Sequence, residues 1–301
     1  MKLNTENFSV FEAGHNHLIL QEANFAGTTS MSHLPTKTIL GSPITAMPFK
    51  QQIAVIMNWA KERQPRFVCV ANVHMLVEAR LKKEFSEVLK QADLVTPDGM
   101  PLVWMLKCLG SLRQNRVAGM ELFENLCKNA EASEIPIFLL GSQKEILERM
   151  TNRLKENYPN LQLAGTAPLP FRPLSPSERA DVLESIRKSG AGLVFVSLGC
   201  PKQENWMSQN SAQVPAVMLG LGGVFPVYAG IHRWAPRWIR ESGLEWIYRL
   251  IQDPKRLWKR YLTTNSVFLV LAMLQLIGYF FQPLFPKRQN LEVQPFPEHN
   301  P

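Results

Sequence analysis

The sequence predicts an α/β protein with a Rossmann-like, mostly parallel sheet and helices on both faces. Short apolar runs typical of buried strands alternate along the chain with segments of helical periodicity. Several of these runs end in glycine, as strands do where a parallel sheet meets a ligand. The chain has 301 residues and is 46% hydrophobic, which is enough to bury one large core.

The expected elements follow one another from about residue 38 to residue 219. The Gln64–Pro65 step ends the first helix, because the residue before proline avoids the helical conformation. The predicted strands are 38–41, 67–71, 94–96, 116–118, 137–140, 161–165, 193–198 and 216–219. The predicted helices are 49–63, 75–90 in two stretches, 100–109, 120–132, 143–157, 175–188 and 202–209.

The patterns divide the chain into four parts. Residues 1–36 are polar and are expected to form a loosely ordered extension, and residues 37–229 form the Rossmann-like core. A basic helical appendage follows over 230–262, and an apolar, membrane-associating tail over 263–301. No secretory signal peptide is expected. The cysteines lack metal-binding or disulfide spacing, which favours a reducing compartment; they are Cys69, Cys108, Cys127 and Cys200.

Positive charge is concentrated in the appendage. Residues 231–262 carry eight lysines and arginines against three acids, which accounts for +5 of the net charge of +8. A phosphorylated substrate, anionic lipid and nucleic acid all fit such a patch. A solvated helix surface would contain more acids.

The tail contains one long apolar run. Residues 267–281 have only Gln275 as a strongly polar side chain, and fifteen residues fall short of the about 20 that a spanning helix needs. Extension to Phe285 adds Gln282 and Pro283. A monotopic or re-entrant helix anchored by flanking cations is favoured, with full spanning and burial against the core as alternatives.

Three glycine turns follow predicted strands and are candidate walls of one ligand cleft. They are the run from Ser197 to Glu204, the run from Gly220 to Gly223, and Gly141–Ser142. Backbone N–H groups in such turns can approach a phosphate. Ordinary turn chemistry is the alternative for each one alone.

Four polar side chains are expected at the same sheet edge. Asp98 stands in a Pro-Asp-Gly turn after a strand, and Asn72 follows another strand. Arg116 opens the short segment Arg-Val-Ala-Gly, and Gln203 stands at the start of the helix that follows Gly199. A carboxylate, a guanidinium and two amides can act as base, phosphate clamp and sugar-orienting groups. For Asp98, a turn or N-cap role is the alternative.

Five segments together resemble the WecG/TagA/CpsF glycosyltransferases, in order and spacing, from about residue 39 to residue 261. They are 72–75, 92–99, 116–119, 201–204 and 243–250. The resemblance implies inverting transfer of a sugar, of N-acetylmannosamine type, from a UDP-sugar to a polyprenyl-diphosphate-linked sugar at the cytoplasmic membrane face. It places the reaction in cell-surface polysaccharide or teichoic-acid-type glycan synthesis. It implies no cofactor, no metal and no nucleic acid partner, and a homo-oligomer is compatible with it.

Roles follow from the resemblance position by position. Asp98 matches the general base and Gln203 the catalytic glutamine near the sugar, while Asn72 and Arg116 match pocket residues. The chain departs from the family pattern at Val70, where threonine is frequent, and at Pro226, where aspartate is frequent.

Arginines are expected to replace a metal ion at the diphosphate, because the chain has no Asp-x-Asp pair. Arg249, Arg256 and Arg260 recur at i, i+7 and i+11, which would put them on one helix face over the cleft. Contact with anionic lipid head groups is the alternative. The predicted substrate-binding residues are Asn72, Arg116, Gly141, Ser142, Gly222, Gly223, Arg249, Arg256 and Arg260.

Two other function classes remain open on the sequence. A Rossmann oxidoreductase would need Gly-x-Gly-x-x-Gly followed by an acid about 20 residues later, and the chain lacks this pattern. A non-catalytic, nucleotide-binding membrane adaptor would leave Asp98, Arg116 and Gln203 without a purpose.

Overall fold

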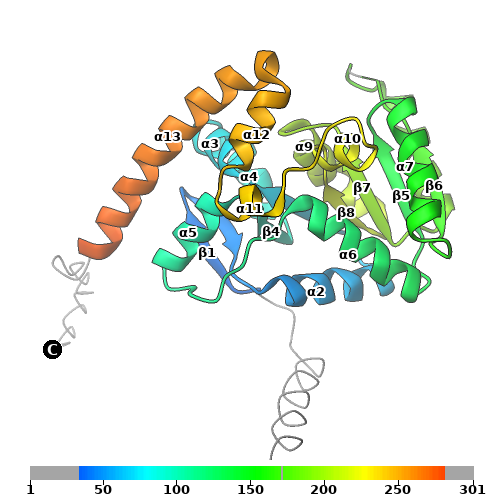
Figure 1. Ribbon diagram of the computed structural model, residues 1–301. Helices are drawn as coiled ribbons and strands as arrows, with labels where there is room; N and C mark the ends of the chain where they lie inside the picture. Colours follow the sequence, from blue (N-terminus) through cyan, green and yellow to red (C-terminus); the bar gives the residue numbers. More distant parts are fainter. Residues whose placement is uncertain (1–33, 171, 282–301) are drawn as a thin grey trace, which may run out of the picture. The chain divides into compact units, whose positions relative to one another are not determined.

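Six short strands form a parallel sheet at the centre of the molecule. The computed structural model describes residues 34–170 and 172–281 (Figure 1). The strands pair in the order β4-β3-β8-β7-β5-β6, every pair parallel, so their carboxyl ends share one edge. This confirms the predicted fold class. The strands are β3 (Arg66–Ala71), β4 (Leu94–Pro97), β5 (Ile137–Gly141), β6 (Leu163–Ala167), β7 (Leu193–Ser197) and β8 (Val217–Gly220).

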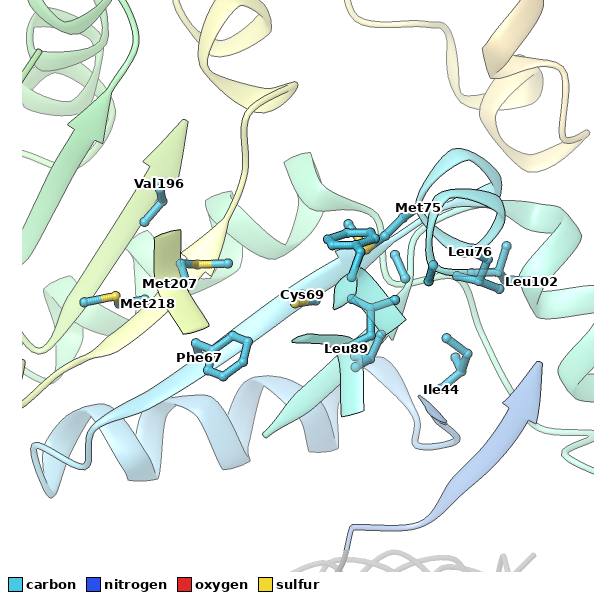
Figure 2. Packing of buried hydrophobic residues seen from close by; sticks show 14 of the residues in the cluster. Ile44, Phe67, Cys69, Met75, Leu76, Leu89, Leu102, Val196, Met207 and Met218 are labelled. Carbon is cyan, nitrogen blue, oxygen red and sulfur yellow. The ribbon is translucent and has the colours of Figure 1, made fainter. Parts of the chain in front are cut away.

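One face of the sheet carries the largest apolar cluster. Side chains alternate along β3, so Phe67, Cys69 and Ala71 all point to this face. In Figure 2, Phe67 and Cys69 of β3 lie on the same side of the sheet as Met218 of β8 and Met207. Helices cover this cluster. Those helices are α3 (Val73–Leu81), α4 (Lys83–Gln91), α8 (Pro176–Ser189) and α9 (Lys202–Asn210), and a 3₁₀ turn follows at Ser211–Gln213.

A second set of helices covers the opposite face. Phe123 of α6 meets Phe195 of β7 edge-on, with ring centroids 4.9 Å apart, and meets Tyr228 of α10 in the same way. Helices on both faces were predicted and are confirmed. The second set is α2 (Phe49–Lys61), α6 (Gly119–Ala132), α7 (Lys144–Asn157) and α10 (Val224–Tyr228).

A small hairpin extends the molecule beside β4. It consists of β1 (Thr36–Ile39) and β2 (Ser42–Thr45), and Val95 N–H donates to Thr45 Oγ1 at 3.1 Å. The hairpin packs near α5 (Met100–Cys108). The strand predicted at 116–118 is wrong: this segment is an extended connection, with Val117 N–H donating to Pro97 O.

Three helices follow the core: α11 (Arg237–Glu241), α12 (Glu245–Gln252) and α13 (Pro254–Phe281). Proline suits the first turn of a helix and cannot continue one, so Pro254 starts α13 and separates it from α12. The boundary predicted between appendage and tail, at 262/263, lies inside α13. Most of the predicted N-terminal extension and the end of the tail, residues 282–301, fall outside the described residues.

The helix α13 is 28 residues long, and the predicted apolar run, 267–281, forms its C-terminal part after a basic first half. By length and composition α13 could cross a membrane. One face nevertheless packs along α3 and the core (Figure 1), with Leu257, Thr264, Phe268 and Ala272 buried. Gln275 fixes the far end, because its Oε1 accepts from Leu40 N–H at 2.9 Å and its Nε2 donates to Thr38 O at 2.7 Å.

The other face of α13 is apolar and exposed. We call it the α13 apolar stripe. Its side chains are between 50% and 64% exposed, so no other part of the described chain covers them. They are Leu262, Leu269, Val270, Met273, Leu274, Ile277 and Phe280.

Candidate active site

Asp98 directly follows β4 at the carboxyl edge of the sheet. Its N–H donates to Ala71 O at 2.8 Å, which ties it to the end of β3. Its Oδ1 accepts from the N–H of Gly119, the first residue of α6, at 3.1 Å. The N-cap of the helix after Asp98 is Gly99, so the carboxylate does not cap that helix. It lies instead at the positive N-terminus of α6.

Two arginines and a second carboxylate surround Asp98. Glu245 Oε2 lies 2.6 Å from Arg116 Nη1, and Glu245 Oε1 accepts from Arg249 Nε at 3.0 Å. The side chains of Arg116 and Glu245 are only 10% and 17% exposed, whereas that of Arg249 is 43% exposed. We call these four residues the Asp98 cluster. It joins the core to α12, although its members are far apart in sequence.

The two carboxyl groups of the Asp98 cluster titrate differently. Burial raises the pKa of Asp98 to about 6, and the charge of Glu245 adds to this effect against the opposing charges of Arg249 and Arg116. Burial also acts on Glu245, but Arg249 and Arg116 outweigh it and hold the pKa of Glu245 below its usual value. Asp98 is therefore ionised at neutral pH yet poised to accept a proton.

Further ion pairs connect the appendage, residues 230–262, to the core. Glu121 of α6 accepts from Arg116 Nη2 at 3.4 Å and forms an ion pair with Arg240 of α11. The Arg240 guanidinium in turn stacks 3.9 Å from the centroid of the Trp234 ring. These contacts hold the elements that carry Glu245 and Arg249 against the sheet edge.

Gln203 lies in the first turn of α9 but is buried, with 5% exposure. Its Oε1 accepts from the N–H groups of Gly199 at 3.2 Å and Gly222 at 3.1 Å. Its Nε2 donates to Glu204 Oε1 at 2.8 Å. We call these four residues the Gln203 cluster. The side chain expected near the sugar is thus largely occupied by protein partners.

The glycine turns border both clusters. A Cβ built at Gly223 would stand 3.3 Å from Arg249 Nη1, so the turn after β8 reaches the Asp98 cluster. The turn after β5 is held differently: Ser142 N–H donates to Ser197 O at 2.9 Å, and both Gly141 and Ser142 have positive φ. A Cβ at Gly141 would collide with Ser197 O.

Asn72 follows β3 next to the strand end that Asp98 contacts. Its Oδ1 accepts from Met75 N–H at 3.2 Å and caps α3. The Oδ1 atom is therefore used for a cap, while the amide nitrogen has no protein partner among the described residues. Its assignment to the substrate pocket stays a prediction.

The three arginines do not share one helix face, and that expectation is wrong. Arg249 belongs to α12 and is a member of the Asp98 cluster, whereas Arg256 and Arg260 belong to α13. The start of a new helix at Pro254 breaks the i, i+7, i+11 spacing. Arg256 pairs with Asp253 and is 65% exposed. Arg260 lies over the ring of Tyr261, 5.2 Å from its centroid.

Sequence reasoning missed Glu245, Glu121 and Glu204 as members of the site. Glu245 stands inside a motif that was recognised, 243–250, but its buried partner Arg116 lies 129 residues away. Among residues 34–170 and 172–281, no group of three or more histidine, cysteine, aspartate or glutamate side chains is arranged to hold a metal ion.

The sequence was compared with known proteins. The model of the glycosyl transferase WecG/TagA/CpsF family matches residues 37–280. Relatives from Bacillus spizizenii and Bacillus subtilis are 33% and 32% identical over 68% and 65% of this chain, and over 78% and 75% of their own. A relative from Staphylococcus aureus is 31% identical over 64% of this chain and 74% of its own. All three are named N-acetylglucosaminyldiphosphoundecaprenol N-acetyl-beta-D-mannosaminyltransferase.

Proposed function

The chain belongs to the WecG/TagA/CpsF family of glycosyl transferases, and from this premise we propose its substrates and mechanism. The enzyme transfers N-acetylmannosamine from a UDP-sugar to N-acetylglucosamine carried on a polyprenyl diphosphate, with inversion at the anomeric carbon. The names of the three relatives support the sugar and the lipid-linked acceptor. The Asp98 cluster supports the mechanism.

Asp98 acts as the general base, and the observation that carries this proposal is its place at the carboxyl edge of the sheet, where its Oδ1 meets the N-terminus of α6. Burial there raises its pKa to about 6. In the reaction, an acceptor hydroxyl oxygen bonds to the anomeric carbon of the donor while the bond from that carbon to the diphosphate breaks. The hydroxyl proton passes to an Asp98 carboxylate oxygen. A carboxyl group with this pKa is mostly ionised at pH 7 and is a stronger base than an ordinary aspartate.

Arg249 stabilises the departing diphosphate. It is the most exposed member of the Asp98 cluster and it borders the Gly222–Gly223 turn, so a diphosphate at that turn meets its guanidinium. Arg116 is held on both sides by Glu245 and Glu121 and positions the cluster. This division of labour needs no divalent cation on the diphosphate.

The enzyme works at the cytoplasmic face of the cell membrane, where its acceptor resides. The α13 apolar stripe supports this placement, because inserting it at the interface of the cytoplasmic leaflet removes large apolar side chains from water. The residues on the opposite face of α13 keep it packed on the core. The fold thus favours peripheral or monotopic attachment.

Release of UDP tests the proposal directly. Purified full-length protein is incubated with UDP-N-acetylmannosamine and a short-chain polyprenyl-diphosphate N-acetylglucosamine, with other UDP-sugars in parallel. We expect UDP and a β-linked disaccharide product, seen by NMR, and activity within about twofold in the presence of EDTA. Preference for another UDP-sugar would overturn the donor assignment. Loss of activity in EDTA, restored by Mg²⁺, would overturn the arginine mechanism.

A further inference from the structure

The Gln203 side chain joins two turns that are distant in sequence. Its one amide oxygen receives the N–H of Gly199, in the turn after β7, and the N–H of Gly222, in the turn after β8. The two turns therefore meet at a single atom. Any movement of that oxygen changes the spacing between them.

Glu204 determines which way this amide points. Only the amide oxygen can accept from the two backbone N–H groups, and a carboxylate oxygen, or the carbonyl oxygen of a protonated carboxyl, accepts from the nitrogen end of the amide. Glu204 Oε1 lies 2.8 Å from Gln203 Nε2. Turning the amide by half a rotation would exchange all three favourable contacts for three unfavourable ones.

Glycines leave space for the Gln203 side chain. A Cβ at Gly222 would stand 2.7 Å from Gln203 Oε1, and a Cβ at Gly220 would stand 2.8 Å from Gln203 Nε2. Both separations are shorter than side-chain carbons adopt, so the amide fills the room that these glycines provide. The backbone at Gly220 and Gly222 thus confines the Gln203 side-chain amide on one side, and Glu204 orients it.

A buried carboxyl group is a costly way to orient one amide. Glu204 is fully buried, and its Oε2 has no hydrogen-bond partner among the described residues. An apolar side chain at this position would avoid the desolvation cost. It would also leave Gln203 Nε2 buried without an acceptor and free to turn.

We propose that Glu204 is a positioning residue for the sugar transfer: it orients the Gln203 amide, which then sets the spacing of the turns after β7 and β8. The Gly222–Gly223 turn borders Arg249, so this spacing determines where the guanidinium meets the donor diphosphate. Gln203 acts here through the backbone of the two turns that it joins. This inference rests on the proposed function for its kinetic consequence only.

The test combines hydrogen exchange with kinetics on full-length Glu204→Leu and Glu204→Gln. Leucine removes the acceptor, whereas glutamine keeps an oxygen that Gln203 Nε2 can use. In the free enzyme, we expect the Gly199 and Gly222 amides to exchange about tenfold faster in Glu204→Leu and within about twofold of wild type in Glu204→Gln. The KM for the UDP-sugar should rise roughly fivefold or more in Glu204→Leu alone.

The outcomes separate positioning from simple stabilisation. A purely structural Glu204 would lower the folded fraction and the apparent kcat, and would leave the two amides and the donor KM of the folded enzyme unchanged; that result would overturn the inference. Equal damage in Glu204→Gln would overturn it too, because charge and not the acceptor would then matter. If Glu204→Leu does not fold, Glu204→Asp withdraws the acceptor by one methylene and should show the same exchange at both glycines. The exchange measurement needs no substrate, so it stands apart from any failure of the proposed reaction.

Discussion

The Asp98 cluster and the Gln203 cluster occupy the same edge of one sheet, yet they use their polar groups in opposite ways. In the Asp98 cluster, a carboxylate with one backbone hydrogen bond lies beside a guanidinium that is 43% exposed. In the Gln203 cluster, the amide is 5% exposed and the neighbouring carboxyl is fully buried. The Asp98 cluster leaves polar groups accessible to a ligand, whereas the polar groups of the Gln203 cluster bind the backbone of two turns. The type of a polar residue at a strand end is therefore a weaker guide to catalysis than the number of hydrogen bonds that its side chain already makes within the protein.

The largest effect is expected at Asp98. Asp98→Asn keeps the shape of the side chain but removes the proton acceptor, so kcat should fall by about 10²-fold or more. Affinity for UDP, measured by calorimetry, should change little. Asp93→Asn is the matched control, because Asp93 is at the opposite end of β4, paired with Arg66 at 2.6 Å. Near-normal turnover in Asp98→Asn would mean that the base lies elsewhere.

Arg249 and Arg256 provide the next test of the comparison. Arg249→Gln removes a charge from the Asp98 cluster and should lower kcat/KM by about tenfold or more. Arg256→Gln removes the same charge from a side chain that is 65% exposed and forms an ion pair with Asp253, just before α13. It should stay within about twofold of wild type on a short-chain acceptor. Equal losses in steady-state assays would show that both arginines serve one function.

The Gln203 cluster should make the stability of the fold depend on pH. Burial raises the pKa of Glu204 to about 7, so between pH 4.5 and 7 the folded protein holds a proton that the unfolded chain has lost. The contribution is fully present below pH 4.5 and is lost as pH rises through about 7. Urea titrations should show the free energy of unfolding falling by up to roughly 1 kcal/mol per pH unit relative to Glu204→Gln. Parallel curves for the two proteins would contradict the assignment.

A smaller shift should separate the two carboxylates of the Asp98 cluster. The charge of Glu245 raises the pKa of Asp98, so Glu245→Gln should lower that pKa and move the acid limb of the kcat/KM profile from about pH 6 to lower pH. Wild-type activity is lost as pH falls through about 6. Glu241→Gln, at an exposed ion pair with Arg237, is the control and should leave the profile in place. A shift to higher pH in Glu245→Gln would contradict the geometry.

The sequence was a good guide to the sheet and to one half of the site. Buried strands that end in glycine or in polar residues have a strong local signal, and Asp98 and Arg116 are indeed part of one cluster. The hairpin strand β2 and the helix α10 were missed because both are short and contain proline, at Pro43 and Pro226. The segment 116–118 is extended without a neighbouring strand, a distinction that depends on tertiary pairing.

Other parts of the site depend on contacts that local sequence does not encode. The ion pair between Arg116 and Glu245 joins residues 129 positions apart. The two hydrogen bonds that the Gln203 amide oxygen accepts form only when the fold brings the turns after β7 and β8 side by side. The break between α12 and α13 did carry a local signal in Asp253–Pro254, and weighing that proline would have separated the arginines.

The contact of Gln203 with the backbone of β8 constrains how related sequences can diverge. Its amide occupies the space that a Cβ at Gly220 or Gly222 would need. Alanine at either glycine would force the Gln203 amide to shift away from its hydrogen-bond partners, and loss of the glutamine removes both the obstacle and the bond that fixes the turn. The three positions should therefore change together across an alignment, as one inherited unit. At Gly199 no atom of the described residues lies within 4 Å of a built Cβ, and its positive φ is what favours glycine there.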